Sequence, residues 1–257
     1  MENYWVQNSI GRKLQRSRLN RFKNSKIVNK LFRSRSPNEA YIAMHVKAGS
    51  RILDIACGAG QTALVKYGEV YGVDLEGFPV DECIKIGYKD AKIWKRDLAI
   101  PFKGKFDVVF CSNLNAHIDF QTLINILNTV VDILKNDGCI LFVNEYEGSS
   151  FLEVQMRSNP FKYDLYKSNA DHLFITSENE WVSEINKLEF LKLVDTTKLS
   201  TFLPSIHYYW WRSGNNLEIS LFKKNIFYAL DFIFSIFEFF VKESHGFYVG
   251  HKFVKRK

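Results

Sequence analysis

The sequence has few cysteines and prolines, and what it lacks excludes several classes of protein. Its 257 residues include 4 cysteines, 5 prolines and 14 glycines. Scattered cysteines without a CxxC pair predict free, mostly buried thiols rather than a disulfide framework or a zinc site. So few prolines and glycines exclude collagen-like and low-complexity chains. A hydrophobic content of 46% excludes a disordered chain and allows a sizeable core.

The net charge of +7 comes from one end of the chain. Residues 1–35 hold ten basic residues and one acid, a net charge of +9, whereas the remainder has 25 basic and 27 acidic residues, a net −2. Apolar residues recur among these charges at roughly helical spacing. We therefore expect a basic helical N-terminal arm over residues 1–35. It could meet an anionic membrane, a nucleic acid or an anionic substrate, or it could be a solvated helix face.

Short apolar segments alternate with helical ones after this arm. The expected strands are 51–55, 69–73, 92–95, 106–111, 139–144, 191–196 and 247–253. Helices are expected to begin at Ser36, Gln61, Asp119 and Ser177, the third ending at Asn136-Asp137-Gly138. This alternation predicts an α/β fold, a Rossmann-like seven-stranded, mostly parallel sheet with helices on both faces, as one domain over residues 36–257.

Carboxylates and glycines gather at the expected strand ends. Asp54 ends the first strand, and Gly58-Ala59-Gly60 follows at once. Asp74 ends the second strand, twenty residues after Asp54. Ligands of open parallel sheets bind at the carboxyl ends of strands, where glycines let the backbone approach closely. An anionic Asp54 would repel a pyrophosphate but suits a ligand with a sulfonium and an ammonium group. The two oxygens of Asp74 could bind two ribose hydroxyls.

Five segments in order resemble motifs of the class I S-adenosylmethionine (SAM)-dependent methyltransferases, especially the small-molecule group that includes quinone methyltransferases. They are Leu53–Gly60, Gly72–Asp74, Asp97–Phe102, Phe106–Val109 running on to His117, and Leu134–Gly138. Ala56 stands where the family's first glycine often lies. The resemblance covers residues 36–200 and the closing strand near 247–257. It implies SAM as cofactor and no metal.

The same resemblance implies which residues form the cofactor site. Asp74 would hold the ribose, Asp97 the adenine amino group, and Leu98 would lie against the ring. The implied cofactor-binding residues are Asp54, Ala56, Cys57, Gly58, Gly60, Asp74, Leu75, Asp97, Leu98 and Asn113.

Two residues near the strand ends are candidate catalytic bases. His117 follows the fourth strand by six residues, and Glu145 follows the fifth. Many methyltransferases of this kind use a general base to deprotonate a hydroxyl or an amine. His117 could instead cap or pack against a helix, and Glu145 could be a solvated loop acid.

An aromatic-rich insertion at about residues 203–246 is the most individual feature. Residues 225–242 show a helical pattern with one narrow polar stripe and six phenylalanines on its wide apolar side. The longest apolar stretch, residues 226–241, contains Asp231 and Glu238 and is too short and polar for a membrane span. This segment could pack on the core, form a homodimer interface, line a pocket for an apolar substrate or contact a membrane surface.

These observations together predict a SAM-dependent methyltransferase that acts on a small molecule, a lipid or a lipid-linked glycan, at an oxygen atom. An RNA methyltransferase that uses the basic arm and a non-catalytic methyltransferase-like binding subunit are the alternatives. The chain begins without the apolar stretch of a secretory signal, so a cytoplasmic location is expected, with peripheral contact at the inner face of the membrane as an extension.

Overall fold

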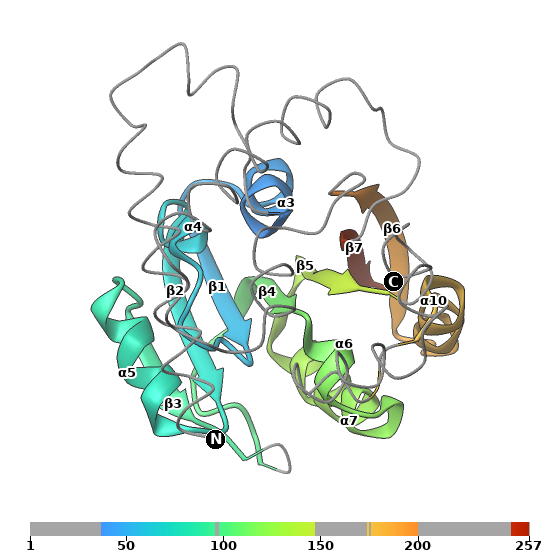
Figure 1. The fold of residues 1–257 in the computed structure, drawn as a ribbon. Helices are drawn as coiled ribbons and strands as arrows, with labels where there is room; N and C mark the ends of the chain where they lie inside the picture. The colour runs from blue at the N-terminus through green and yellow to red at the C-terminus, as the bar shows by residue number, and fades with distance from the viewer. Residues whose placement is uncertain (1–36, 96–97, 147–173, 175, 200–247, 257) are drawn as a thin grey trace, which may run out of the picture.

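The computed structural model describes residues 37–95, 98–146, 174, 176–199 and 248–256, and these residues form one seven-stranded sheet (Figure 1). Its strand order is β3-β2-β1-β4-β5-β7-β6. The strands are β1 (Ser50–Ile55), β2 (Gly68–Asp74), β3 (Asp90–Ile93), β4 (Phe106–Ser112), β5 (Leu134–Glu145), β6 (Leu191–Lys198) and β7 (Tyr248–Lys255). Strands β1 to β5 are parallel, and β7 is antiparallel to both β5 and β6. The predicted Rossmann-like, mostly parallel sheet is therefore confirmed.

Helices cover both faces of this sheet because its central strands are apolar on both sides. The helices are α3 (Pro37–His45), α4 (Thr62–Val65), α5 (Gly77–Lys85), α6 (Leu114–His117), α7 (Phe120–Ile133) and α10 (Glu178–Asn186). One hydrophobic cluster packs α7 and α10 onto the sheet, and a second packs α3, α4 and α5 onto the other face. Neighbouring residues of β4 alternate between them, since Val109 belongs to the first cluster and Val108 and Phe110 to the second.

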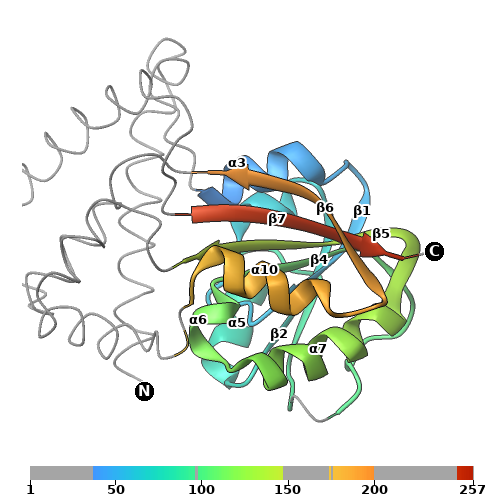
Figure 2. The ribbon, with the colours of Figure 1, turned by 90° about the vertical axis from the view of Figure 1, so that its right-hand side faces the viewer.

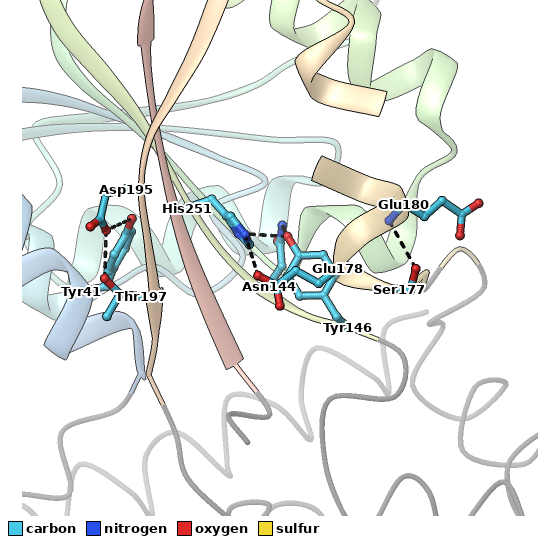
Figure 3. Close-up of polar contacts among 9 residues, drawn as sticks. All are labelled: Tyr41, Asn144, Tyr146, Ser177, Glu178, Glu180, Asp195, Thr197 and His251. Carbon is cyan, nitrogen blue, oxygen red and sulfur yellow. Dashed lines mark hydrogen bonds and ion pairs between the residues drawn. The ribbon is translucent and has the colours of Figure 1, made fainter. Parts of the chain in front are cut away.

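Two groups of polar contacts fasten helices to the antiparallel side of the sheet (Figure 3). On one face, the Tyr41 hydroxyl of α3 donates to Asp195 of β6 over 3.2 Å. On the other, the buried ring of His251 on β7 lies 3.2 Å from Glu178 of α10 and 3.2 Å from the hydroxyl of Tyr146. The His251 contact holds the Glu178 carboxylate in its charged form, which lowers the pKa of Glu178 despite its partial burial.

Local sequence signals place several helix starts correctly. Asp119 caps α7, since its Oδ1 accepts the backbone N–H of Thr122 over 2.7 Å. Ser177 caps α10 through the backbone N–H of Glu180 over 3.3 Å, as expected from the capping-box pattern (Figure 3).

Other expected boundaries are wrong. Helix α7 ends at Ile133, and β5 begins at once at Leu134, so residues 136–138 lie within the strand instead of ending the helix. The pairing with β4 shifts there, between Phe106 and Val108, which accommodates the extra residues as an irregularity of the strand. Strand β3 lies two residues earlier than expected, and neither α5 nor α6 was predicted.

The basic arm at residues 1–35 and the insertion at about 203–246 lie outside the described residues, as does Asp97. Among the residues that the structure describes, none of the helices has the length and apolar character needed to cross a membrane.

Candidate active site

The carboxyl end of β1 carries a tight loop whose backbone conformation departs from that of ordinary L-residues. Ala56, Gly58 and Gly60 have positive φ angles of 52°, 50° and 77°. A Cβ on Gly60 would lie 2.4 Å from Cδ1 of Ile86, so a larger residue there would also require the Ile86 side chain to move. Ala56 adopts this left-handed conformation in spite of its side chain, which costs about 1–2 kcal/mol. The loop thus exposes backbone groups at the edge where ligands of such sheets bind.

Asp74, the last residue of β2, holds this loop through hydrogen bonds to its backbone. Its Oδ2 accepts the backbone N–H of Gly58 over 2.9 Å, and its Oδ1 accepts the N–H of Leu75 over 2.8 Å. The residue is only 9% exposed. Burial raises the pKa of Asp74, and the backbone N–H groups of Gly58 and Leu75 oppose that rise because they favour the charged carboxylate. Since a carboxylate can accept up to about four hydrogen bonds, Asp74 can still accept one from a ligand.

Asp54 lies on the neighbouring strand and is tied to the same loop by a residue that sequence reasoning missed. The Tyr88 hydroxyl donates to Oδ2 of Asp54 over 2.5 Å and accepts the backbone N–H of Gln61 over 2.7 Å. Tyr88 stands between α5 and β3, and no motif signals it. Both Asp54 and Tyr88 are buried, at 2% and 4% exposure.

Two cysteines line the underside of the loop. The thiol of Cys83, on α5, donates to the carbonyl of Gly58 over 3.2 Å, and the backbone N–H of Cys57 donates to Val73 over 3.0 Å. Contact with Cys83, burial and the nearby carboxylate of Asp54 raise the pKa of Cys57. Cys57 is therefore a protonated, buried thiol within the loop.

Two of the predicted cofactor residues are exposed leucines. Leu75 directly follows Asp74 and is 49% exposed, and Leu98 is 56% exposed. Exposed leucines of this kind offer a surface against which a flat ring can pack. Both belong to the predicted cofactor set, whereas their expected companion Asp97 lies outside the described residues.

The ends of β4 and β5 bring together two other predicted residues, Asn113 and Glu145. The Asn113 side-chain amide donates to Oε1 of Glu145 over 3.3 Å, and the Tyr248 hydroxyl of β7 donates to the same oxygen. Asn113 has a positive φ of 55°, and its backbone N–H donates to Val143 over 2.9 Å. Glu145 is 4% exposed, so it is an oriented, buried carboxylate and not a solvated loop acid.

His117 has a different setting from Glu145. It is the last residue of α6 and is exposed. The backbone carbonyl of its neighbour Ala116 accepts the N–H of Phe174 over 3.1 Å.

A pocket of about 260 Å³ opens beside α6, where α7 and α10 begin. Figure 2 shows these three helix ends at the same end of the sheet, the end toward which the parallel strands run. The lining of this pocket is mainly apolar and aromatic, and consists of Asn115, Ile118, Asp119, Phe120, Leu123, Phe174, Thr176 and Trp181. Asn115 links it to the site, because its side-chain amide donates to the backbone carbonyl of Glu145 over 3.0 Å.

The site thus joins backbone N–H groups, buried carboxylates and apolar flanks at the carboxyl ends of β1, β2, β4 and β5. Residues 53–142 match the family model described as a methyltransferase domain. Residues 53–142 are therefore similar to a methyltransferase domain, and the strand order is that of the predicted Rossmann-like fold. The matched residues run from β1 to β5 and include the glycine loop and Asp74. A search of curated proteins found no match.

Solved structures agree with this fold. The YcgJ protein from Bacillus subtilis is 18% identical, with 86% of this chain and 98% of that chain covered and a TM-score of 0.53. A TehB-like SAM-dependent methyltransferase from Corynebacterium glutamicum is 14% identical, with 94% and 97% covered and a TM-score of 0.52. Geranyl diphosphate C-methyltransferase from Streptomyces coelicolor, solved with Mg²⁺, geranyl diphosphate and S-adenosyl-L-homocysteine (SAH), is 18% identical, with 90% and 84% covered and a TM-score of 0.54.

Proposed function

We propose that this chain is a SAM-dependent methyltransferase that methylates an oxygen atom of a small molecule, a lipid or a lipid-linked glycan. The observation that carries the proposal is the preformed loop at the end of β1, which Asp74 holds through Gly58 and Leu75. Such a loop between two carboxylates suits a nucleoside with cationic groups far better than a diphosphate. The similarity to a methyltransferase domain and the SAH-bound structural neighbour support SAM as that nucleoside.

The described residues fit SAM by their chemistry. In this proposal Asp74 accepts a hydrogen bond from the ribose, and Leu75 and Leu98 flank the adenine ring. Asp54 attracts the ammonium group of the methionine moiety. SAM supplies a methyl group already activated on a positive sulfur, so the protein has to bind, orient and exclude water.

Glu145 is our candidate for the group that takes the acceptor's proton. Tyr248 and Asn113 both donate to its Oε1, so the carboxylate is held in one orientation at the end of β5. A positioned carboxylate can accept the proton of a hydroxyl as that oxygen attacks the methyl group. His117 stays the second candidate, since it is exposed near the same edge of the sheet.

The pocket beside α6 supports an acceptor with an apolar part. Its lining includes Phe120, Leu123, Phe174 and Trp181, and no lysine or arginine among the residues that the structure describes. Geranyl diphosphate C-methyltransferase, a structural neighbour, was solved in complex with both geranyl diphosphate and SAH. In the same proposal the basic arm brings the enzyme to the inner face of a membrane, and the insertion contacts the membrane or a second copy of the chain.

Incubation of cell extract with methyl-labelled SAM and the purified chain tests this function. We expect label in the lipid, glycan or small-molecule fraction, and at least tenfold less transfer at low SAM concentration by a variant with Asp74→Ala. Label confined to RNA, with binding that falls steeply as salt rises, would instead support the RNA methyltransferase alternative. SAM binding without transfer to any fraction would indicate a non-catalytic subunit.

A further inference from the structure

Tyr88 occupies a position from which one hydroxyl contacts both ends of the glycine loop. Asp54 precedes the loop and Gln61 follows it, and the Tyr88 oxygen lies 2.5 Å from Oδ2 of the first and 2.7 Å from the backbone nitrogen of the second. The Tyr88 ring also packs over β2, because a Cβ on Gly72 would lie 3.1 Å from ring carbon Cδ2.

The direction of these two hydrogen bonds is fixed by the number of protons. A phenol has a single O–H proton, and the Gln61 N–H can only donate. The Tyr88 oxygen therefore accepts the hydrogen bond from Gln61, and the Tyr88 O–H donates its hydrogen bond to Asp54. Burial raises the pKa of Tyr88 well above its usual value, which keeps the phenol protonated. Asp54 is then an acceptor, and the arrangement favours its charged form.

The carboxylate of Asp54 is only 2% exposed, so the hydrogen bond from Tyr88 takes the place of one that water would supply to an exposed carboxylate. A buried carboxylate that loses a hydrogen-bond donor tends to take up a proton. A neutral Asp54 would no longer attract a cation.

We propose that Tyr88 is a positioning residue of the cofactor site, which keeps Asp54 ionised toward the ammonium group of the methionine moiety. This rests on the proposed function, since it assigns the ammonium group of SAM to Asp54. Tyr88 acts through Asp54 and does not itself touch the reacting atoms.

Two ligands separate this role from a purely structural one. SAH carries the amino-acid moiety, whereas 5′-methylthioadenosine has the same adenosine and sulfur without it. We expect Tyr88→Phe to weaken SAH binding about tenfold, the effect of one hydrogen bond to a charged group, and to leave 5′-methylthioadenosine binding within about twofold. Tyr71→Phe is the matched control, because the Tyr71 hydroxyl donates to the exposed Glu69 over 3.4 Å, and its removal should change neither affinity.

Calorimetry measures the affinity of each variant for both ligands and so distinguishes the two roles. Equal weakening of the two ligands would show that Tyr88 supports the loop alone, and no change in either would show that it does not act on the site; both overturn the inference. In an Asp54→Asn background, Tyr88→Phe should not change the ratio of the two affinities further, and a further change would also contradict it.

A second variant keeps the inference testable if Tyr88→Phe does not fold. Incorporation of 3-fluorotyrosine at position 88 retains the hydroxyl and should retain the wild-type preference for SAH, and loss of that preference would refute the role. A wild-type chain that binds neither ligand would refute the proposed function and the inference with it. A wild-type preference for SAH that survives Tyr88→Phe would refute the inference alone.

Discussion

Replacement of Asp74 by alanine should affect folding and ligand binding at the same time. The carboxylate accepts the N–H groups of Gly58 over 2.9 Å and Leu75 over 2.8 Å, and it is 9% exposed. Truncation leaves both donors without that partner, and each buried unpaired N–H costs about 1–3 kcal/mol. We expect the free energy of unfolding to fall by about 2–4 kcal/mol. Loss of the charged hydrogen bond to the ribose should weaken SAH binding by a further 1.5–3 kcal/mol, or about tenfold to 150-fold.

Urea unfolding measures the first effect, and calorimetry with SAH, below the unfolding transition, measures the second. Asp90→Ala is the matched control, since Asp90 begins the adjacent strand β3 and forms a surface ion pair with Lys92 at 3.4 Å. That pair contributes little, so the control should resemble the wild type in both assays. A chain with Asp74→Ala that keeps its stability and its affinity for SAH would refute the reasoning that places Asp74 at the centre of the site.

Three further changes test the local physics. Ala56→Gly should stabilise the fold by up to about 1 kcal/mol in urea unfolding, because glycine relieves the positive φ at the cost of chain entropy, and clear destabilisation would contradict this. Gly68→Ala should lower the free energy of unfolding by about 3 kcal/mol, because the new Cβ would lie 1.9 Å from the backbone oxygen of Ser50; wild-type thermal stability would count against it. The pKa of Glu178 is lowered in the folded state, so its contact with His251 stabilises the fold fully above pH 4.5 and progressively less as the pH falls through the folded-state pKa. Unfolding curves measured over a series of pH values should therefore show a smaller loss of stability in acid for Glu178→Gln than for the wild type. Equal losses for the two chains would contradict this.

The sequence was sufficient to predict the sheet because its central strands are short apolar runs between clear loop signals. It also predicted which residues meet at the first two strand ends, since Asp54, Gly58 and Asp74 follow or end strands that lie side by side. Helix α7 was predicted from the Asp119 cap, but its end was misplaced, because Asn136-Asp137-Gly138 resembles a helix stop while tertiary pairing with β4 draws those residues into β5.

Contacts between distant parts of the chain were beyond sequence reasoning. Tyr88 lies 34 residues from Asp54, and Tyr248 lies 103 residues from Glu145. Sequence spacing does not predict contacts between residues so far apart, and an isolated tyrosine is usually assigned to the hydrophobic core. The fold brings these hydroxyls to their carboxylates, because it places the segment after α5 against the glycine loop and β7 beside β5.

Calorimetric titration of the wild-type chain with SAH is the most direct test of the site at the carboxyl ends of β1 and β2. Saturable binding at one site per chain, weakened by Asp74→Ala but not by Asp90→Ala, is the predicted result. Absence of any heat of binding from SAH and SAM, in a chain shown to be folded by its unfolding transition, would contradict it.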